Sequence, residues 1–120
     1  MKILIVDDSK AMRKIVQRAL QSTQAYGGAA LVEATNGREA LDVVESEQPD
    51  IVLSDWNMPE MTGIELLEVL KERGAAPKTF GFVTSESTPE MYDRAISAGA
   101  GFLVSKPFTA EALESALAAA

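Results

Sequence analysis

Four segments of the sequence carry side chains suited to phosphate and metal chemistry. Each follows a short apolar run: Asp7 and Asp8 after residues 3–6, Asp55 after residues 51–53, Thr84 and Ser85 after residues 80–83, and Lys106 after residues 102–104. If these runs are parallel strands of one sheet, their ends meet at its carboxyl edge, where open α/β sheets bind ligands.

Three carboxylates gathered at one edge repel one another unless a hard cation lies among them, and Mg²⁺ prefers oxygen ligands. A carboxylate is also a nucleophile toward phosphorus, giving an aspartyl phosphate. Transfer of a phosphoryl group then needs positive charge around its oxygens. The compact ammonium of Lys106 suits this role, and the Thr84 hydroxyl is a donor to a phosphoryl oxygen.

Simpler interpretations exist for each residue alone. A carboxylate between a strand and a helix, such as Asp7 or Asp8, most often caps the helix and favours its positive end. Asp55 alone is equally ambiguous, because strands often end in Asp. Capping preferences do not readily explain why two strand ends carry acids, a third a lysine and a fourth a hydroxyl. This coincidence favours a site that binds a divalent metal and accepts a phosphoryl group.

The elements that would position these residues follow from the apolar pattern. Five short apolar runs alternate with five helical patterns, which predicts βαβ units and a parallel sheet in one doubly wound α/β domain. The expected strands are 2–6, 29–34, 50–54, 79–83 and 101–104. The second is the expected edge strand, because it contains Glu33 and several alanines. Gly81, inside the fourth strand, indicates close packing by a neighbour.

Capping residues mark the helix ends. Ser9, Thr88 before Pro89, and Thr109 are expected N-caps. Asn36 with Glu39, and Thr62 with Glu65, have the spacing of capping boxes. Gly74 and Gly99 stand where left-handed C-terminal residues belong. The first helix has an apolar stripe expected to face inward, formed by Met12, Ile15, Val16, Ala19 and Leu20.

Composition limits the classes of function. The 120 residues predict one domain, 1–120, with 47% hydrophobic and 24% charged residues. The net charge of −7 argues against nonspecific binding to nucleic acid or anionic membranes. There is no cysteine, and the apolar run 3–6 is too short for a signal or membrane-spanning segment. We therefore expect a cytoplasmic protein.

The motifs Ile-Val-Asp7-Asp8-Ser, Ser-Asp55-Trp-Asn-Met-Pro, Val-Thr84-Ser and Ser-Lys106-Pro-Phe together resemble the signatures of response-regulator receiver domains, closest to the single-domain chemotaxis regulators of the CheY type. The resemblance spans the chain. It implies a flavodoxin-like fold with five parallel strands in the order 2-1-3-4-5 and five helices.

The same resemblance implies the roles of the site residues. Asp55 would be the phosphoacceptor. The implied ligands of Mg²⁺, for which Mn²⁺ is a possible substitute, are the Asp8 and Asp55 carboxylates and the Asn57 backbone carbonyl, with Asp7 acting indirectly or through water. Thr84, Ser85 and Lys106 would bind the phosphoryl group and sense its presence, and the bond between Lys106 and Pro107 would be cis.

One departure from the family pattern concerns its switch. Receivers usually carry Tyr or Phe three residues before the lysine, where this chain has Leu103. The aromatic residue, Phe102, comes one position earlier, and a shift of one residue along a strand places a side chain on the opposite face. We therefore expect Phe102 to be a core residue.

The implied function is a signalling switch and not an enzyme acting on external substrates. A histidine kinase would donate the phosphoryl group, and a monomeric protein would signal by binding a downstream protein, with the flagellar motor switch as the candidate target in chemotaxis. A receiver of another pathway or a phosphate sink is an alternative. A Mg²⁺-dependent phosphohydrolase would need a second Asp two residues after Asp7, where Ser9 stands, and the complete acid, hydroxyl and lysine set argues against an interaction module with an inactive pocket.

Overall fold

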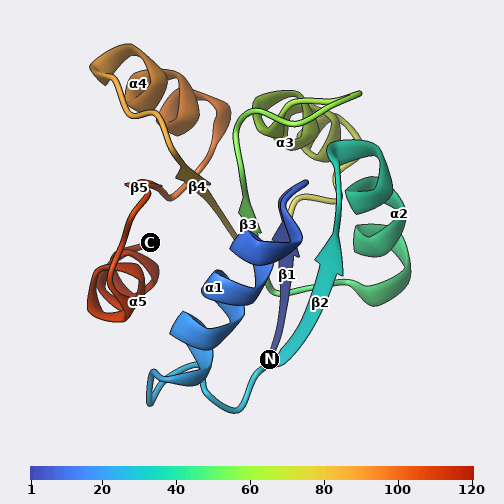
Figure 1. The fold of residues 1–120 in the computed structure, drawn as a ribbon. Helices are drawn as coiled ribbons and strands as arrows, with labels where there is room; N and C mark the ends of the chain where they lie inside the picture. Colours follow the sequence, from blue (N-terminus) through green and yellow to red (C-terminus); the bar gives the residue numbers. More distant parts are fainter.

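Five parallel strands form one sheet in a computed structural model that describes all of residues 1–120 (Figure 1). The strands are β1 (Lys2–Val6), β2 (Ala30–Ala34), β3 (Ile51–Ser54), β4 (Thr79–Thr84) and β5 (Phe102–Ser105). The helices are α1 (Lys10–Gln21), α2 (Gly37–Glu47), α3 (Gly63–Glu72), α4 (Pro89–Ala98) and α5 (Ala110–Ala119). The strand order is β2-β1-β3-β4-β5, which confirms the expected doubly wound fold with β2 at an edge.

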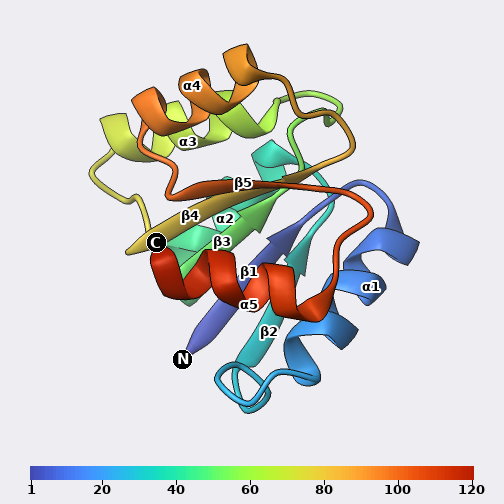
Figure 2. The same cartoon turned by 90° about the vertical axis from the view of Figure 1, so that its left-hand side faces the viewer.

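The continuous apolar runs are explained by burial of both faces of the sheet. In β1, Ile3 and Ile5 join the core against α1 and α5, whereas Leu4 and Val6 join the core against α2, α3 and α4. Figure 2 shows α3 and α4 on one side of the sheet and α1 and α5 on the other. None of these helices is long and apolar enough to cross a membrane.

The topology reverses at β1, which pairs with β2 on one side and with β3 on the other. Val6 lies beside Ser54 in the register of β1 and β3. The residues that follow these strands, Asp7 and Asp55, therefore emerge next to each other at the switch point of the sheet, the usual ligand position in open α/β folds.

Side-chain caps begin the helices, with one difference from the expected pattern. Thr62 and Glu65 form a reciprocal capping box at α3. At α2, Asn36 Oδ1 accepts the Glu39 N–H at 2.8 Å. The Glu39 carboxylate, however, accepts the Thr35 hydroxyl at 2.9 Å, so α2 has a cap without a capping box.

The apolar stripe of α1 is correct at Val16 and Leu20 and wrong at Ile15. Ile15 is 48% exposed, and Arg13 is turned toward the sheet with 9% exposure. Arg13 is accommodated by polar partners at the carboxyl edge: its Nε donates to Glu33 Oε1 at 2.9 Å and its Nη1 to the Asp7 carbonyl at 2.6 Å.

Close packing at Gly81 is confirmed. A Cβ at Gly81 would overlap the ring of Phe102, the neighbouring residue on β5. Phe102 is 7% exposed and belongs to the core between the sheet and the helices α1 and α5. Glycine in β4 therefore makes room for a buried ring on the adjacent strand.

Candidate functional site

The end of β1 presents two carboxylates in different environments. Asp7 is 4% exposed, and its Oδ1 accepts the Ser9 N–H at 2.9 Å while its Oδ2 accepts Lys106 Nζ at 3.0 Å. Its own N–H donates to the Ala34 carbonyl at 3.1 Å. Asp8 is exposed at the start of the same turn. Asp7 is therefore held in place by the fold, whereas Asp8 faces outward.

The end of β3 places Asp55 beside this pair. The Asp55 N–H donates to the Val6 carbonyl at 2.8 Å, which extends the ladder between β1 and β3 by one residue. Its Oδ1 accepts the Trp56 N–H at 2.7 Å, and its Oδ2 lies 3.5 Å from Lys106 Nζ. The side chain is 13% exposed, so the carboxylate is enclosed but reachable from solvent.

Lys106 reaches these acids from β5, two strands away from β3. Its N–H donates to the Thr84 carbonyl at 2.8 Å, and its extended side chain crosses the end of β4. Neighbouring strands lie about 4.8 Å apart. A lysine side chain is long enough to span two such spacings, from β5 past β4 to β3. The bond from Lys106 to Pro107 is cis.

The acidic residues have a geometry that fits a metal ion. Carboxylate oxygens of Asp7, Asp8 and Asp55 all lie within 4.8 Å of one another. The Lys106 ammonium contacts two of these three carboxylates, so the group retains a negative charge that a divalent cation would offset. Mg²⁺ prefers a small number of carboxylates and retains several waters, and this set with the outward-facing Asp8 suits it.

Burial raises the pKa of the Asp55 carboxyl above its ordinary value. Lys106 lowers that pKa and the charge of Asp7 raises it, and the Trp56 N–H lowers it further. Burial and the neighbouring acid thus outweigh the ammonium and the hydrogen bonds. The ionised form of Asp55 would therefore be stabilised by additional positive charge at this site.

The other candidate residues surround Asp55. Thr84 ends β4, fully buried, and its Oγ1 accepts the Glu86 N–H at 3.4 Å. Ser85 is exposed at the start of the segment that leads to α4, and Asn57 is exposed in the loop between β3 and α3. The structure therefore brings all the expected segments to the carboxyl edge of the sheet.

Residues 3–118 of this chain match the response regulator receiver domain family. The chain belongs to this family. Receivers are the signalling domains of two-component systems, and they are not classical enzymes.

Chemotaxis proteins are among the relatives of this receiver. The chemotaxis protein CheY of Pseudomonas aeruginosa is 38% identical over 115 residues, covering 95% of this chain and 90% of that protein. A CheY homolog of Campylobacter jejuni is 35% identical, covering 98% and 89%. The structure of Vibrio cholerae chemotaxis protein CheY4 is similar with a TM-score of 0.85 and 34% identity, covering 98% of this chain and 95% of that one.

Leu103 and Phe102 lie on opposite faces of β5 in this receiver. Leu103 is half-buried and packs toward the core that contains α4, whereas Phe102 packs over Gly81 on the side of α5. The position that carries an aromatic ring in most receivers thus holds an aliphatic side chain here. Phe102 is a core residue, as its place in the strand alternation predicts.

Two residues that position the site gave no recognisable sequence signal. Gly63 begins α3, and a Cβ there would overlap the Asp55 carbonyl; its N–H donates to the Trp56 carbonyl at 2.8 Å. Only glycine allows the helix to begin this close to the candidate phosphoacceptor. Arg13, which binds the Asp7 carbonyl, was also missed, because a basic residue on a surface helix is usually solvated.

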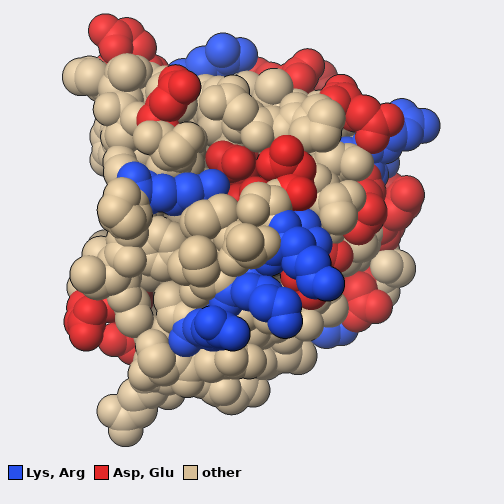
Figure 3. All heavy atoms as spheres, in the orientation of Figure 1, with Lys and Arg blue, Asp and Glu red and all other residues tan.

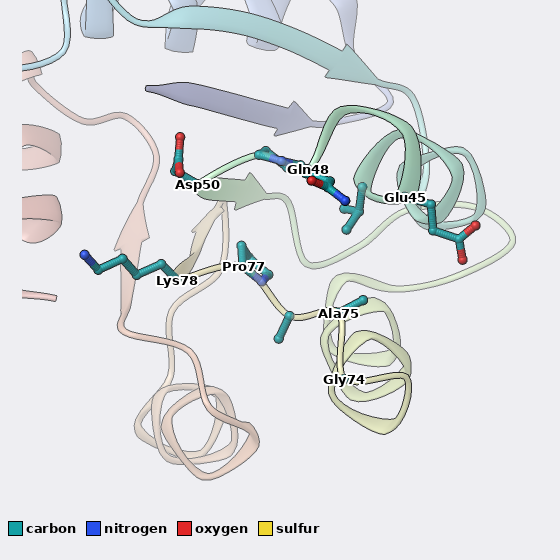
Figure 4. A pocket seen from close by; sticks show the side chains of 10 residues that line it. Glu45, Gln48, Asp50, Gly74, Ala75, Pro77 and Lys78 are labelled. Carbon is teal, nitrogen blue, oxygen red and sulfur yellow. The ribbon is translucent and has the colours of Figure 1, made fainter.

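A surface hollow of about 470 Å³ lies far from these residues, at the opposite end of the sheet. The C-terminal end of α2 and the segment between α3 and β4 enclose it, with Gln48 and Pro77 in its wall (Figure 4). The charged groups of Glu45 and Lys78 point away from it (Figure 4), and Glu45 pairs with Arg73 at 2.8 Å. No polar groups converge in this hollow as they do around Asp55.

Proposed function

We propose that this receiver accepts a phosphoryl group on Asp55 from a histidine kinase. An Asp55 carboxylate oxygen attacks phosphorus, the phosphorus–nitrogen bond of the phosphohistidine breaks, and the departing imidazole nitrogen retains the electron pair and takes up a proton. The product is an acyl phosphate. The observation that carries the proposal is the convergence of Asp55 with Asp7, Asp8 and Lys106 at the switch point.

The surrounding residues have distinct proposed roles. Asp8, Asp55 and the Asn57 carbonyl would hold Mg²⁺, and Asp7 would support it indirectly through its fixed carboxylate. When bound, the metal would supply positive charge against the phosphoryl oxygens. Lys106 would supply a second positive charge from its place between the Asp7 and Asp55 carboxylates.

The phosphoryl group then changes the segment that follows β4. Thr84 and Ser85 lie at its start, and their hydroxyls donate to the new oxygens. Phosphorylation adds charge and acceptors that order short segments through one to three charge-assisted hydrogen bonds. The changed surface is bound by a downstream protein. The chemotaxis relatives support a role in chemotaxis, and the proposed target of this monomeric, cytoplasmic regulator is the flagellar motor switch.

Phosphorylation of the purified protein by acetyl phosphate with Mg²⁺ tests the assignment directly. We expect the native chain to gain one phosphoryl group by intact mass and Asp55→Asn to gain none. The matched control is Asp42→Asn, which removes an exposed aspartate of α2 and leaves the site intact. Uptake by the Asp55→Asn variant, or its loss in the Asp42→Asn variant, contradicts the assignment.

A further inference from the structure

Asp7 and Arg13 are the two charged residues among the buried ones in this protein. They are in contact: Arg13 Nη1 donates to the Asp7 carbonyl at 2.6 Å. The Nε of the same guanidinium donates a second hydrogen bond, to Glu33 Oε1 on β2 at 2.9 Å. One side chain of α1 therefore joins the edge strand to the turn that carries Asp7 and Asp8.

Arg13 differs from the other basic residues of its helix. Lysine and arginine side chains gather over α1, which has no acidic residue (Figure 3). Lys10, Lys14 and Arg18 are exposed, as solvated surface residues usually are, whereas Arg13 is turned inward.

The location of Arg13 is electrostatically unfavourable for the helix alone. It is the fourth residue of α1, near the amino end, where the helix dipole disfavours a positive charge. Burial of a guanidinium is costly as well unless it is paired and hydrogen-bonded. Its partners, the Asp7 carbonyl and Glu33, must therefore fix the side chain in this place.

We propose that Arg13 is a positioning residue for the acidic site, an inference that rests on the proposed binding of Mg²⁺. By holding the Asp7 carbonyl, Arg13 fixes the backbone of the turn and thereby the directions of the Asp7 and Asp8 side chains. Glu33 holds the guanidinium in register with that carbonyl. Groups that orient metal ligands typically contribute tenfold or more to metal affinity.

Charge and geometry make opposite predictions for this residue. Arg13 and Mg²⁺ carry charges of the same sign, so loss of the arginine charge alone would tighten metal binding. Loss of its orienting hydrogen bonds would weaken metal binding. Arg13→Lys separates the two effects, because lysine keeps the charge but lacks the planar fork that binds two acceptors at fixed angles.

The experiment is a Mg²⁺ titration of the unphosphorylated protein, monitored by the fluorescence of Trp56. Trp56 is the one tryptophan, and its backbone N–H donates to Asp55 Oδ1. We expect Arg13→Lys to raise the Kd for Mg²⁺ roughly tenfold. The control Arg18→Lys makes the same change at an exposed position of α1 and should leave the Kd unchanged. Saturating Mg²⁺ should restore phosphorylation by acetyl phosphate in Arg13→Lys, because Asp55 itself is intact.

A second variant tests the loss of the hydrogen bonds without a change in net charge. Arg13→Met combined with Glu33→Gln deletes the pair without changing the net charge, and it should also bind Mg²⁺ more weakly. A native-like Kd in either folded variant would overturn the inference, as would tighter binding in Arg13→Lys. Absence of a Mg²⁺ response in the native chain would instead refute the proposed metal site, so the two failures are distinguishable.

Discussion

Ionisation of the Asp55 carboxyl is expected to affect stability, because burial and the charge of Asp7 raise its pKa. A raised pKa in the folded state means that the folded state binds the proton more tightly than the unfolded chain. Without metal, this residue therefore lowers stability as pH rises from the ordinary aspartate pKa of about 3.9 through the raised value, and the cost persists above it.

We accordingly expect Asp55→Asn to be more stable than the native protein at neutral pH in metal-free buffer. The difference should shrink as pH falls through the raised pKa and vanish below the ordinary one. Urea unfolding of both proteins at a series of pH values, with a chelator present, measures it. A constant difference at every pH would show that the amide changes packing and not ionisation.

Thr84 and Phe102 should differ in what they contribute, since one lies at the site and the other in the core. Thr84→Ala removes the proposed donor to the phosphoryl group, so we expect beryllofluoride, a phosphoryl mimic, to bind without the normal spectral change. Phe102→Leu should lower stability and keep that change. The measurement is a pair of NMR spectra for each variant, with and without the mimic; a native-like shift in Thr84→Ala, lost in Phe102→Leu, would assign the switch to Phe102.

At the scale of elements, β4 and β5 fit together through one glycine and one ring. Gly81→Ala would place a methyl group in the Phe102 ring, and such overpacking costs about 1–3 kcal/mol. Phe102→Leu removes the ring, so the two substitutions together should cost less than the sum of their separate effects. Urea unfolding of the double-mutant cycle measures this coupling.

Gly28 provides the control for this cycle. A Cβ at Gly28 has no neighbour within 4 Å, so Gly28→Ala should change stability little. Additive losses for Gly81→Ala and Phe102→Leu would contradict the packing that joins the two strands.

The elements were largely predictable because short apolar runs and capping residues are local signals. The strand boundaries differ from the expected ones by one residue at most, and Ser9, Thr62 and Thr109 begin helices as expected. The inward side of α1 was predicted less well. Helical spacing places Ile15 beside Ala19 and Arg13 beside Val16, and the tertiary partners of the guanidinium allow the Arg13 side to be the buried one.

At the scale of the whole molecule, the positions of the site residues could be predicted because a parallel sheet brings its strand ends together. Asp7, Asp55 and Lys106 meet for that reason. The closeness of Gly63 to the Asp55 backbone could not be predicted, because it depends on where α3 begins relative to β3. The dual contacts of Arg13 depend likewise on the placement of three separate elements.

The acidic site should make stability depend on Mg²⁺. A cation that binds only the folded state stabilises it by about 2.7 kcal/mol at a concentration one hundred times its Kd. We expect a higher Tm in Mg²⁺ than in NaCl of equal ionic strength. Asp8→Asn should reduce this gain and raise the Tm in metal-free buffer, because one of three like charges is removed. An equal Tm in both salts would count against the metal site.

Lys106 Nζ and the Asp7 carboxylate are in contact although their positions differ by 99 in the sequence. Contacts between such distant segments form late, because closing a long loop costs entropy before the contact stabilises it. A nascent chain in which β5 has not yet docked holds its aspartates without the ammonium that offsets their charge. We therefore expect competence for phosphorylation to arise in one late event during biosynthesis, so that an incompletely folded molecule transmits no signal.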